Sequence, residues 1–481
     1  MKPKKIRRIF GASKTAGFRM LKPYPYYKDS GVEWIGNVPE GWELRKLSQS
    51  FNSIGSGTTP KSNEEVYYEN GTVPWVITGD LNDSILNETS KKITKEAIND
   101  YSTLKMYSPN SLVIAMYGAT IGKIALLNLK ACVNQACCVL GKSSLLKIKY
   151  VFYWFLANKK NIISLSYGGG QPNISQDLIK TLLITIPSKK EQEEIIQYLD
   201  KKTSEIDKTI QKDKKLIELL KEKRTALINH VVTKGLDLDA KMKDSGVEWI
   251  GEIPEGWKIS KIKDKVTVKI SNVDKKSKEN EPDVLLCNYT DVYNNEFITS
   301  NLDFMKATAN YDQIKRLSIK KDDVIITKDS EDAEDIAVPA IVSEELNNVV
   351  CGYHLALLRH DKSKITGNFL FRLLQSKKIN DQFSVAANGV TRFGISTYPI
   401  KNSYIVVPSL KEQKNITKYL DNQTSKIDKT IHKIQKKITL MEEYKKSLIH
   451  HAVTGKIDVR GEGKSDQTPQ KKVSSQTSLT I

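Results

Sequence analysis

Two loop-like segments of the sequence carry the residue types that contact phosphate groups. Residues 55–61 read Gly-Ser-Gly-Thr-Thr-Pro-Lys, and residues 117–123 read Tyr-Gly-Ala-Thr-Ile-Gly-Lys. Backbone N–H groups, hydroxyls and a lysine together bind phosphate oxygens well. Ordinary turns use the same small residues, so each segment by itself fits both a phosphate contact and a plain turn.

The motifs that would support catalysis are absent from the sequence. Residues 136–143 approach a phosphate-binding loop but lack its first glycine, which lets the backbone cradle phosphate, and their apolar stretch predicts a strand. The sequence holds no G-x-S-x-G, H-E-x-x-H or N-P-P-Y/F segment. The acidic run 329–335 lacks the glycine spacing of a calcium loop and favours a solvated loop. We therefore expect a binding scaffold without a metal site.

The cysteines argue against a disulfide framework, because five is an odd number and no C-x-x-C pair exists. Cys351 and His354 form a lone C-x-x-H, which cannot fill a tetrahedral metal site, and we interpret them as buried strand residues. This cysteine usage predicts a reducing, cytoplasmic compartment.

The charge favours a polyanionic partner. The chain of 481 residues has 75 Lys and Arg against 56 Asp and Glu, a net charge of +19, which is typical of binding to nucleic acid or, less often, to a membrane surface. A lysine-rich host proteome would give the same excess. The sequence contains no apolar run of about 18 residues, so it predicts no membrane span. Residues 1–19 are basic, lack the apolar stretch of a signal peptide and are expected to be a disordered extension.

The sequence contains an internal repeat. Residues 29–42 (DSGVEWIGNVPEGW) and 244–257 (DSGVEWIGEIPEGW) match, and so do 187–210 and 408–431, which both begin with Pro-Ser and end with Ile-Asp-Lys-Thr-Ile. A weaker match relates GGGQPNIS, ending at Ser175, to NGVTRFGIS, ending at Ser396. The middle of each half diverges, and residues 54–61 have no clear partner. Shared segments therefore have a common role, and the diverged segments differ in theirs.

The second matching pair predicts two long helices. Ser188 with Glu191, and Ser409 with Glu412, form S-x-x-E capping boxes. Apolar residues then recur in heptads over about four repeats, which predicts a coiled coil, although a helix packed on its own domain would also need an apolar side. We expect the two helices to pair antiparallel about a pseudo-two-fold axis. The predicted helix–helix seam consists of Leu199, Ile206, Ile210, Ile217, Leu220, Leu227, Leu420, Ile427, Ile431, Ile434, Ile438, Met441 and Leu448.

The parts of the sequence that precede the two long helices predict α+β domains of mixed α/β structure, so that each domain is followed by a long helix. Strand-like runs lie at 112–118, 136–140, 182–187, 323–327 and 404–408, and amphipathic helices are expected at 149–165 and 368–383.

The chain resembles the specificity subunit (HsdS) of type I restriction–modification enzymes over residues 24–456. The resemblance rests on the duplicated GVEWIGxxPEGW motif, the segments that end in Ile-Ser, and the P-S-x-x-E-Q helices that run into I-D-K-T-I. It implies two target recognition domains that each read half of a split, asymmetric DNA site. It also implies antiparallel helices that bind two modification (HsdM) subunits, which methylate adenine with S-adenosylmethionine. Restriction (HsdR) subunits, which use ATP and Mg²⁺, complete the nuclease, and this chain binds no cofactor.

The expected domain limits are 20–187 and 234–407 for the recognition domains, 188–233 and 408–455 for the helices, and 456–481 for a disordered tail. DNA readers need long hydrogen-bonding side chains on loops. The candidates are Thr58, Thr59, Lys61, Tyr117, Thr120, Lys123, Gln171 and Asn173 in the first domain, and Lys275, Lys276, Lys328, Thr391 and Arg392 in the second.

Two alternatives stay open at this point. A nuclease or methyltransferase fused to its own DNA reader would need a cofactor or metal motif. A coiled-coil scaffold with a basic surface for membranes or RNA would not explain why the domains diverge while the helices stay alike. Trp34, Trp42, Trp249 and Trp257 suit partner contacts and the edge of a domain core equally well.

Overall fold

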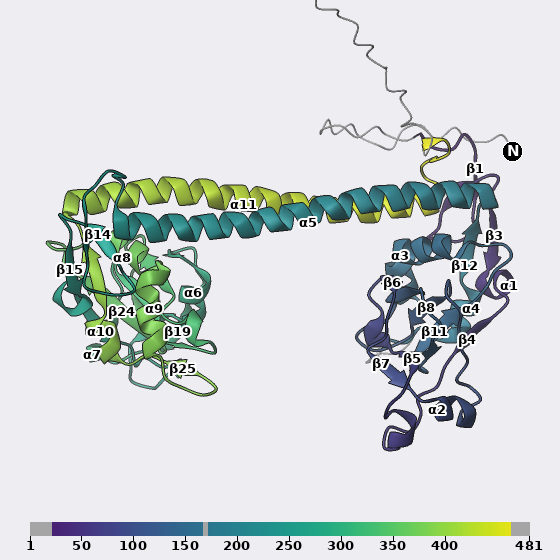
Figure 1. Ribbon diagram of the computed structural model, residues 1–481, viewed down its shortest axis with the longest axis horizontal. Helices are drawn as coiled ribbons and strands as arrows, with labels where there is room; N and C mark the ends of the chain where they lie inside the picture. The colour runs from purple at the N-terminus through teal and green to yellow at the C-terminus, as the bar shows by residue number, and fades with distance from the viewer. Residues whose placement is uncertain (1–21, 167–171, 463–481) are drawn as a thin grey trace, which may run out of the picture. The chain divides into compact units, whose positions relative to one another are not determined.

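The computed structural model describes residues 22–166 and 172–462. The chain forms two compact units. Unit 1 combines residues up to Lys212 with those from Lys437 onward, and unit 2 comprises Asp213–Lys436. The two long helices, α5 (Lys189–Lys234) and α11 (Leu410–Val453), therefore each contribute one part to unit 1 and the other part to unit 2; both are labelled in Figure 1.

Unit 1 contains a five-stranded and a three-stranded sheet. The five-stranded sheet has the order β4-β11-β8-β9-β6, and the three-stranded sheet has the order β10-β5-β7. Neighbours in the first sheet are antiparallel except β6 and β9, and β10 runs parallel to β5. The strands are β4 (Ile54–Ser56), β5 (Val73–Val76), β6 (Ser84–Leu86), β7 (Lys91–Ile93), β8 (Leu112–Ala115), β9 (Ile124–Leu127), β10 (Cys132–Val133) and β11 (Cys137–Leu140).

Unit 2 repeats this topology strand for strand. Its five-stranded sheet has the order β16-β24-β20-β22-β18 and its three-stranded sheet the order β19-β17-β23. The parallel pairs, β18 with β22 and β17 with β23, again fall at equivalent places. The strands are β16 (Val266–Ile270), β17 (Asp283–Cys287), β18 (Phe297–Ile298), β19 (Met305–Thr308), β20 (Val324–Thr327), β22 (Pro339–Val342), β23 (Val349–Cys351) and β24 (Leu355–His360). The structural repeat therefore extends through the segment in which the sequences diverge.

Small two-stranded sheets complete both units. They pair β1 (Tyr27–Asp29) with β2 (Asn37–Pro39), β3 (Glu43–Lys46) with β12 (Leu183–Ile186), β13 (Met242–Asp244) with β14 (Glu252–Pro254), β15 (Lys258–Lys261) with β26 (Tyr404–Val407), and β21 (Asp329–Ser330) with β25 (Phe393–Gly394). The repeated GVEWIG segments form the turns of the β1–β2 and β13–β14 hairpins. Gly31, Gly36, Gly246 and Gly251 have positive φ there, a conformation that glycine adopts without strain.

Shorter helices lie between the strands of both units. They are α1 (Leu47–Ser50), α2 (Lys95–Asp100), α3 (Ile148–Ser164), α4 (Gln176–Thr181), α6 (Tyr289–Asn294), α7 (Tyr311–Leu317), α8 (Gly367–Leu374), α9 (Lys377–Ala386) and α10 (Thr397–Asn402). The single helix predicted over 368–383 is wrong, because it is divided into α8 and α9. The helix tightens at its end, where the Ser376 N–H bonds the Leu373 carbonyl, and the Lys377 N–H at the start of α9 is capped by the Asn229 side chain of α5 at 2.8 Å.

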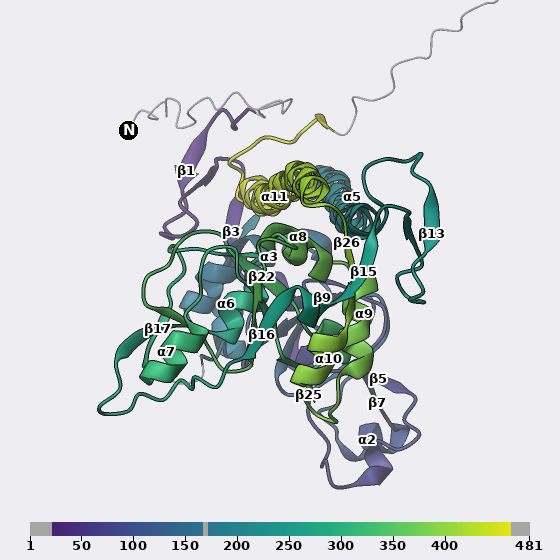
Figure 2. The ribbon, with the colours of Figure 1, turned by 90° about the vertical axis from the view of Figure 1, so that its left-hand side faces the viewer.

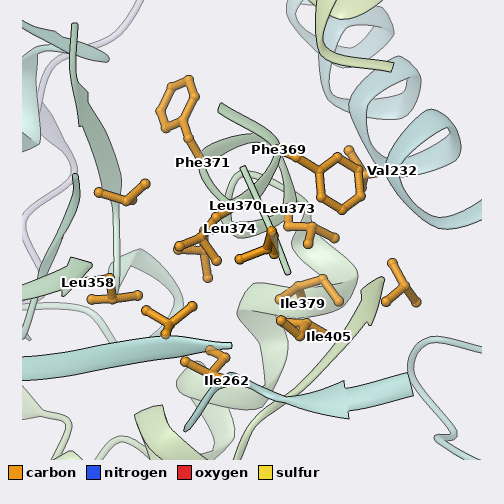
Figure 3. Packing of buried hydrophobic residues seen from close by; sticks show 14 of the residues in the cluster. Val232, Ile262, Leu358, Phe369, Leu370, Phe371, Leu373, Leu374, Ile379 and Ile405 are labelled. Carbon is orange, nitrogen blue, oxygen red and sulfur yellow. The ribbon is translucent and has the colours of Figure 1, made fainter. Parts of the chain in front are cut away.

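The core of unit 2 joins helix α8 to the sheet and to both long helices. Figure 3 shows Phe369 of α8 beside Val232 of α5, with Leu370, Leu373 and Leu374 of the same helix in the packed cluster around them. Val232, Phe369 and Leu373 are fully buried, and burying side chains of this size contributes about 1.5–3 kcal/mol each. Ile416 and Leu420 of α11 belong to the same cluster. The sheet of unit 2, α8 and the adjoining ends of both long helices thus share one hydrophobic core.

The repeated Glu-Gln pairs fix the starts of the long helices to their own units. Gln192 is fully buried; its Oε1 accepts the Lys147 N–H at 2.8 Å, and its Nε2 donates to the carbonyls of Leu145 and Pro187. Gln413 makes the same three bonds in unit 2, to Thr366, Lys364 and Pro408. The two glutamines therefore have a structural role, because their bonds hold the start of each long helix to the loop that precedes α3 or α8.

The pre-domain tryptophans divide between core and surface. Trp42 and Trp257 are 1% and 2% exposed, and the Trp257 Nε1–H donates to Glu412 Oε1 at 2.9 Å. Trp34 packs on Trp154 with ring centroids 5.8 Å apart, whereas Trp249 is 45% exposed. The sequence left this question open, and the contacts place three of the four in packed positions.

Within each unit the two long helices contact each other. The thirteen predicted seam residues are all buried or half-buried. The Lys445 Nζ lies 2.7 Å from the Asp207 carboxylate in unit 1, and Arg224 Nε lies 3.0 Å from Asp428 Oδ1 in unit 2. Figure 2, in which unit 2 faces the viewer, shows its parts of α5 and α11 side by side over α8. None of the helices in the described ranges is both long and apolar enough to cross a membrane.

Candidate functional site

Four segments of unit 2 meet at one end of its five-stranded sheet, where β20 ends and β24 begins. Backbone bonds join them in a row: the Ile395 N–H donates to the Lys328 carbonyl at 2.9 Å, the Lys328 N–H to the His354 carbonyl at 2.8 Å, and the Tyr353 N–H to the Val273 carbonyl at 2.9 Å. We call residues 271–276, 328–335, 352–354 and 388–395 loop cluster 2. Its loops are held by backbone groups, so their side chains are free to vary.

Unit 1 builds the first two bonds of this row from different residues. The Ile174 N–H donates to the Met116 carbonyl at 2.8 Å, and the Met116 N–H donates to the Ala136 carbonyl at 2.9 Å. Tyr117 and Asn173 then form an isolated bridge, and the equivalent residues of unit 2, Asp329 and Gly394, belong to the pairing of β21 with β25. We call residues 57–61, 116–123, 134–136 and 172–174 loop cluster 1.

The strand register makes the first segments of the two clusters equivalent. Ser56 faces Cys138 in unit 1, and Ile270 faces Ala356 in unit 2. The next residue, Gly57, passes so close to Val133 that a Cβ would lie 1.6 Å from its carbonyl oxygen. In unit 2 the Ser271 hydroxyl donates to the carbonyl of Cys351 at 2.5 Å instead.

Counting on from these positions places Lys61 and Lys275 at the same point of the two loops. The two segments share no sequence motif, so only the structure reveals that they are equivalent.

Seven of the eight candidates in the first domain lie in loop cluster 1, and Gln171 falls outside the described residues. The Lys61 side chain is 69% exposed and pairs with Glu64 at 3.0 Å. Tyr117 is 36% exposed and bridges to exposed Asn173. Thr58 shares a 2.6 Å hydrogen bond with Thr103, while Thr59, Thr120 and Lys123 are half-buried.

All five candidates of the second domain lie in loop cluster 2. Lys275, Lys276, Thr391 and Arg392 are exposed. Lys328 differs, because its side chain is only 19% exposed and its Nζ lies 3.3 Å from the Asp329 carboxylate. The prediction treated Lys328 as a freely extending side chain, and the structure holds it within the cluster.

The cysteines offer no thiol chemistry. All five are free and buried. Burial raises the pKa of the Cys132 thiol to about 11 and that of the Cys137 thiol to about 12, so both stay protonated at neutral pH, whereas the thiolate is the reactive form. No group of three or more His, Cys, Asp or Glu in the described residues could hold a metal ion.

The sequence matches the type I restriction modification DNA specificity domain over residues 39–219 and again over 254–440. The chain belongs to this family. The two matches cover the five-stranded and three-stranded sheets of each unit and most of the following helix, so the family's domain occurs twice here.

Relatives and solved structures agree with this assignment over nearly the whole chain. The type I restriction enzyme MjaVIII specificity subunit of Methanocaldococcus jannaschii is 25% identical over 90% of this chain and 98% of its own length. The HsdS subunit of Thermoanaerobacter tengcongensis has a similar fold, with a TM-score of 0.51 and 14% identity over 87% of this chain and 98% of its own. A chain solved in work on assembly and conformational transition of the type I system reaches a TM-score of 0.67 at 13% identity, covering 87% and 99%.

Loop cluster 2 of this specificity subunit contains residues that the sequence did not single out. Cys351 is buried in β23 as expected, but His354 is not a buried strand residue. It occupies a turn with φ +70°, and its side chain, 31% exposed, lies 2.5 Å from Asp329 through Nδ1. Asp329 belongs to the acidic run interpreted as a solvated loop, yet its side chain is only 14% exposed. No local motif could have revealed this contact between separate loops.

Proposed function

We propose that this specificity subunit reads a bipartite, asymmetric DNA site, with one recognition domain for each half. The observation that carries the proposal is that both domains join equivalent loop segments by the same two backbone bonds at the end of the sheet and place different side chains there. Direct readout depends on side chains that match base edges. One scaffold with two side-chain sets is therefore suited to two different half-sites.

The proposed reading residues are the candidates in loop clusters 1 and 2. Lys61 and Lys275 occupy equivalent exposed positions, as a contact shared by both domains with the DNA backbone would require. Gln171 and Arg392 align in sequence and differ in type, as expected for residues that read bases. The recognition domains would comprise about 20–187 and 234–407, with the helices at 188–233 and 408–455.

We infer that α5 and α11 pair as an antiparallel coiled coil with pseudo-two-fold symmetry. The Asp of the repeated I-D-K-T-I segment pairs with a basic residue of the other helix in both units: Asp207 with Lys445, and Asp428 with Arg224. The two pairs occupy equivalent positions when the two repeats are exchanged, as a two-fold interface requires. Cysteines replacing Asp207 and Lys445 should cross-link, whereas cysteines replacing Leu199 and Leu420 should not, and the opposite result would reject antiparallel pairing.

The helices are also proposed to set the spacer between half-sites and to hold the enzymatic partners. α5 has 46 residues, which corresponds to about 70 Å at 1.5 Å per residue. Two modification (HsdM) subunits that use S-adenosylmethionine, and restriction (HsdR) subunits that use ATP and Mg²⁺, would carry the chemistry in the cytoplasm. The chain itself would be non-catalytic and bind no cofactor.

Methylome sequencing of a host that expresses the chain with its partner genes tests the function. We expect methylation at one bipartite motif with two unlike halves. Adding one turn to both helices together should lengthen the spacer and leave the half-site sequences unchanged. A single continuous motif, or an unchanged spacer in these variants, would contradict the proposal. Methylation or cleavage by the purified chain with S-adenosylmethionine or Mg²⁺ alone would show instead that the chain is itself an enzyme.

A further inference from the structure

The two loop clusters differ in the charge of the side chains carried by the residues that the row of backbone bonds joins. The three positions that unit 1 fills with Met116, Tyr117 and Ala136 are filled in unit 2 by Lys328, Asp329 and His354, as the strand registers of β8 with β11 and β20 with β24 show. In unit 1 none of these three side chains carries a charge at neutral pH. The same backbone positions therefore present two chemically unlike surfaces.

Asp329 lies at the centre of this difference. One carboxylate oxygen, Oδ2, is 2.5 Å from His354 Nδ1 and 3.3 Å from Lys328 Nζ. The other, Oδ1, lies where a Cβ on Gly394 would come within 3.0 Å, so the absence of a side chain at Gly394 leaves room for it. The carboxylate is thus enclosed by β25, by Lys328 and by the turn that carries His354.

The contact with Asp329 sets how the His354 ring can be used. Because Nδ1 faces the carboxylate, it carries a proton, and Nε2 is the ring nitrogen left for another partner. The Tyr353 ring, 47% exposed, packs edge-on at 4.1 Å from the His354 ring centroid and further limits its rotation. A fixed imidazole with one available nitrogen is a well-defined hydrogen-bonding group.

A purely structural role does not account for the pair. Unit 1 makes two of these three backbone bonds, Ile174 to Met116 and Met116 to Ala136, with Tyr117 and Ala136 in place of Asp329 and His354, so those two bonds do not need the charged pair. His354 also adopts φ +70°, a backbone conformation that is uncommon in residues other than glycine. Strained backbone of this kind is found most often at functional sites. Loop residues that differ between otherwise equivalent scaffolds are where recognition is expected.

We propose that His354, positioned by Asp329, reads one base pair of the half-site bound by the second domain. The proposal rests on the proposed function and adds a specificity-determining residue to it. His354 would contact the base edge through Nε2, and Asp329 would act as a positioning residue that touches the ring and not the DNA. At the equivalent position of the first domain, Ala136 cannot make such a bond, so the two half-sites would differ at this point.

Methylomes of cells that express His354→Ala, His354→Gln and Asp329→Asn with the partner genes test the proposal. His354→Ala should reduce discrimination at one position of one half-site by about 5- to 150-fold, the range of a good base contact. Asp329→Asn, which keeps the size of the side chain, should weaken the preference at the same position. The other half-site and the spacer should be unchanged, and so should the whole motif in Lys321→Ala, an exposed site at the opposite end of β20.

The possible failures are distinguishable. If wild type methylates a bipartite site and all three variants retain its motif, His354 does not read a base, although the proposed function stands. A uniform loss of methylation over all sites would show that the pair only supports the loops or contacts a phosphate. If wild type gives no bipartite motif, the proposed function itself fails. Thermal unfolding of each purified variant identifies a folding defect, and Asp329→Asn and His354→Gln keep the test valid if His354→Ala does not fold.

Discussion

The ammonium group of Lys445 in α11 lies 2.7 Å from both carboxylate oxygens of Asp207 in α5. Lys445 and Arg224 interrupt the apolar heptads of their helices at equivalent places of the repeat. Both residues form an ion pair with the other helix, since Arg224 contacts Asp428 at 3.0 Å. Arg224 also forms two bonds to Glu296 at 2.6 and 2.8 Å, which ties the second domain to α5.

Substitutions that remove these two ion pairs should lower the stability of the protein by different amounts. Asp207→Lys should be restored by the additional change Lys445→Asp, with a coupling free energy of about 0.2–1 kcal/mol because both side chains are partly exposed. Arg224→Met should cost more, since the Arg224 side chain is only 17% exposed and its loss removes the ion pairs with both Asp428 and Glu296. A double-mutant cycle on thermal unfolding measures the Asp207–Lys445 coupling, and the comparison of Arg224→Met with wild type measures the second cost. A cost of Arg224→Met no larger than that coupling would contradict the prediction.

The buried glutamines should matter far more than glutamines on the helix surface. Gln192→Ala removes three hydrogen bonds and leaves the Lys147 N–H and two carbonyls without that partner. Each unsatisfied buried group costs about 1–3 kcal/mol, so the free energy of unfolding of unit 1 should fall by several kcal/mol. Gln211→Ala, at an exposed position of the same helix, should change it by less than about 0.5 kcal/mol. Equal effects would contradict the structural role.

The helices and the repeat were predictable because their signals are local. Capping boxes and heptads follow from hydrogen bonds and packing within one helix, and Ser188 and Ser409 do cap the backbone N–H of Glu191 and Glu412 at 3.3 Å. The common fold of the diverged segments was not predictable. Buried strands need only apolar residues of suitable size, so β4 and β16 occupy equivalent places without resembling each other.

The candidate site was only partly predictable for a related reason. The loops that carry lysines and hydroxyls were identified from composition, and they lie at the sheet ends. The row that brings them together consists of backbone bonds, which leave no side-chain pattern in the sequence. Asp329 and His354 meet across 25 residues, and each looked ordinary among its own neighbours.

Gly57 should not tolerate even one added methyl group. A Cβ would lie 1.6 Å from the Val133 carbonyl oxygen. Because the oxygen is a backbone atom and the backbone of residue 57 fixes the position of the Cβ, relief requires the loop of residues 57–61 to move. Overpacking of this kind typically costs about 1–3 kcal/mol. Gly57→Ala should therefore destabilise unit 1 and weaken recognition of one half-site, with the second half-site intact in the methylome. Gly41→Ala, where no atom lies within 4 Å, is the control and should leave both unchanged.

Two neighbouring histidines at the end of α11 should make unit 1 sensitive to mild acid. Burial, with smaller effects of Lys456 and His451, lowers the pKa of His450 to about 4, and burial also lowers the pKa of His451. The unfolded chain takes up these protons near pH 6.5 while the folded chain does not, so stability is present above pH 6.5 and is lost as pH falls towards 4.

The double variant His450→Gln/His451→Gln should accordingly lose less stability between pH 7 and pH 5 than wild type does. The readout is the change in unfolding midpoint between the two pH values, which cancels any constant cost of the substitutions. His432→Gln, exposed on the same helix, is the matched control and should retain the wild-type change. An identical pH dependence in wild type and the double variant would show that these histidines do not contribute.

Arg392 is expected to contact the DNA in the second half-site. It is exposed beside β25, and its guanidinium can donate two hydrogen bonds to the O6 and N7 of guanine. Arg392→Ala should relax one position of that half-site at a cost of about 1–3 kcal/mol, seen as methylation of sites that differ from the motif at this base alone. Lys315→Ala, an exposed change on α7, should leave the motif intact. A uniform weakening over all sequences, with a shallower dependence of binding on salt, would instead mark Arg392 as a phosphate contact.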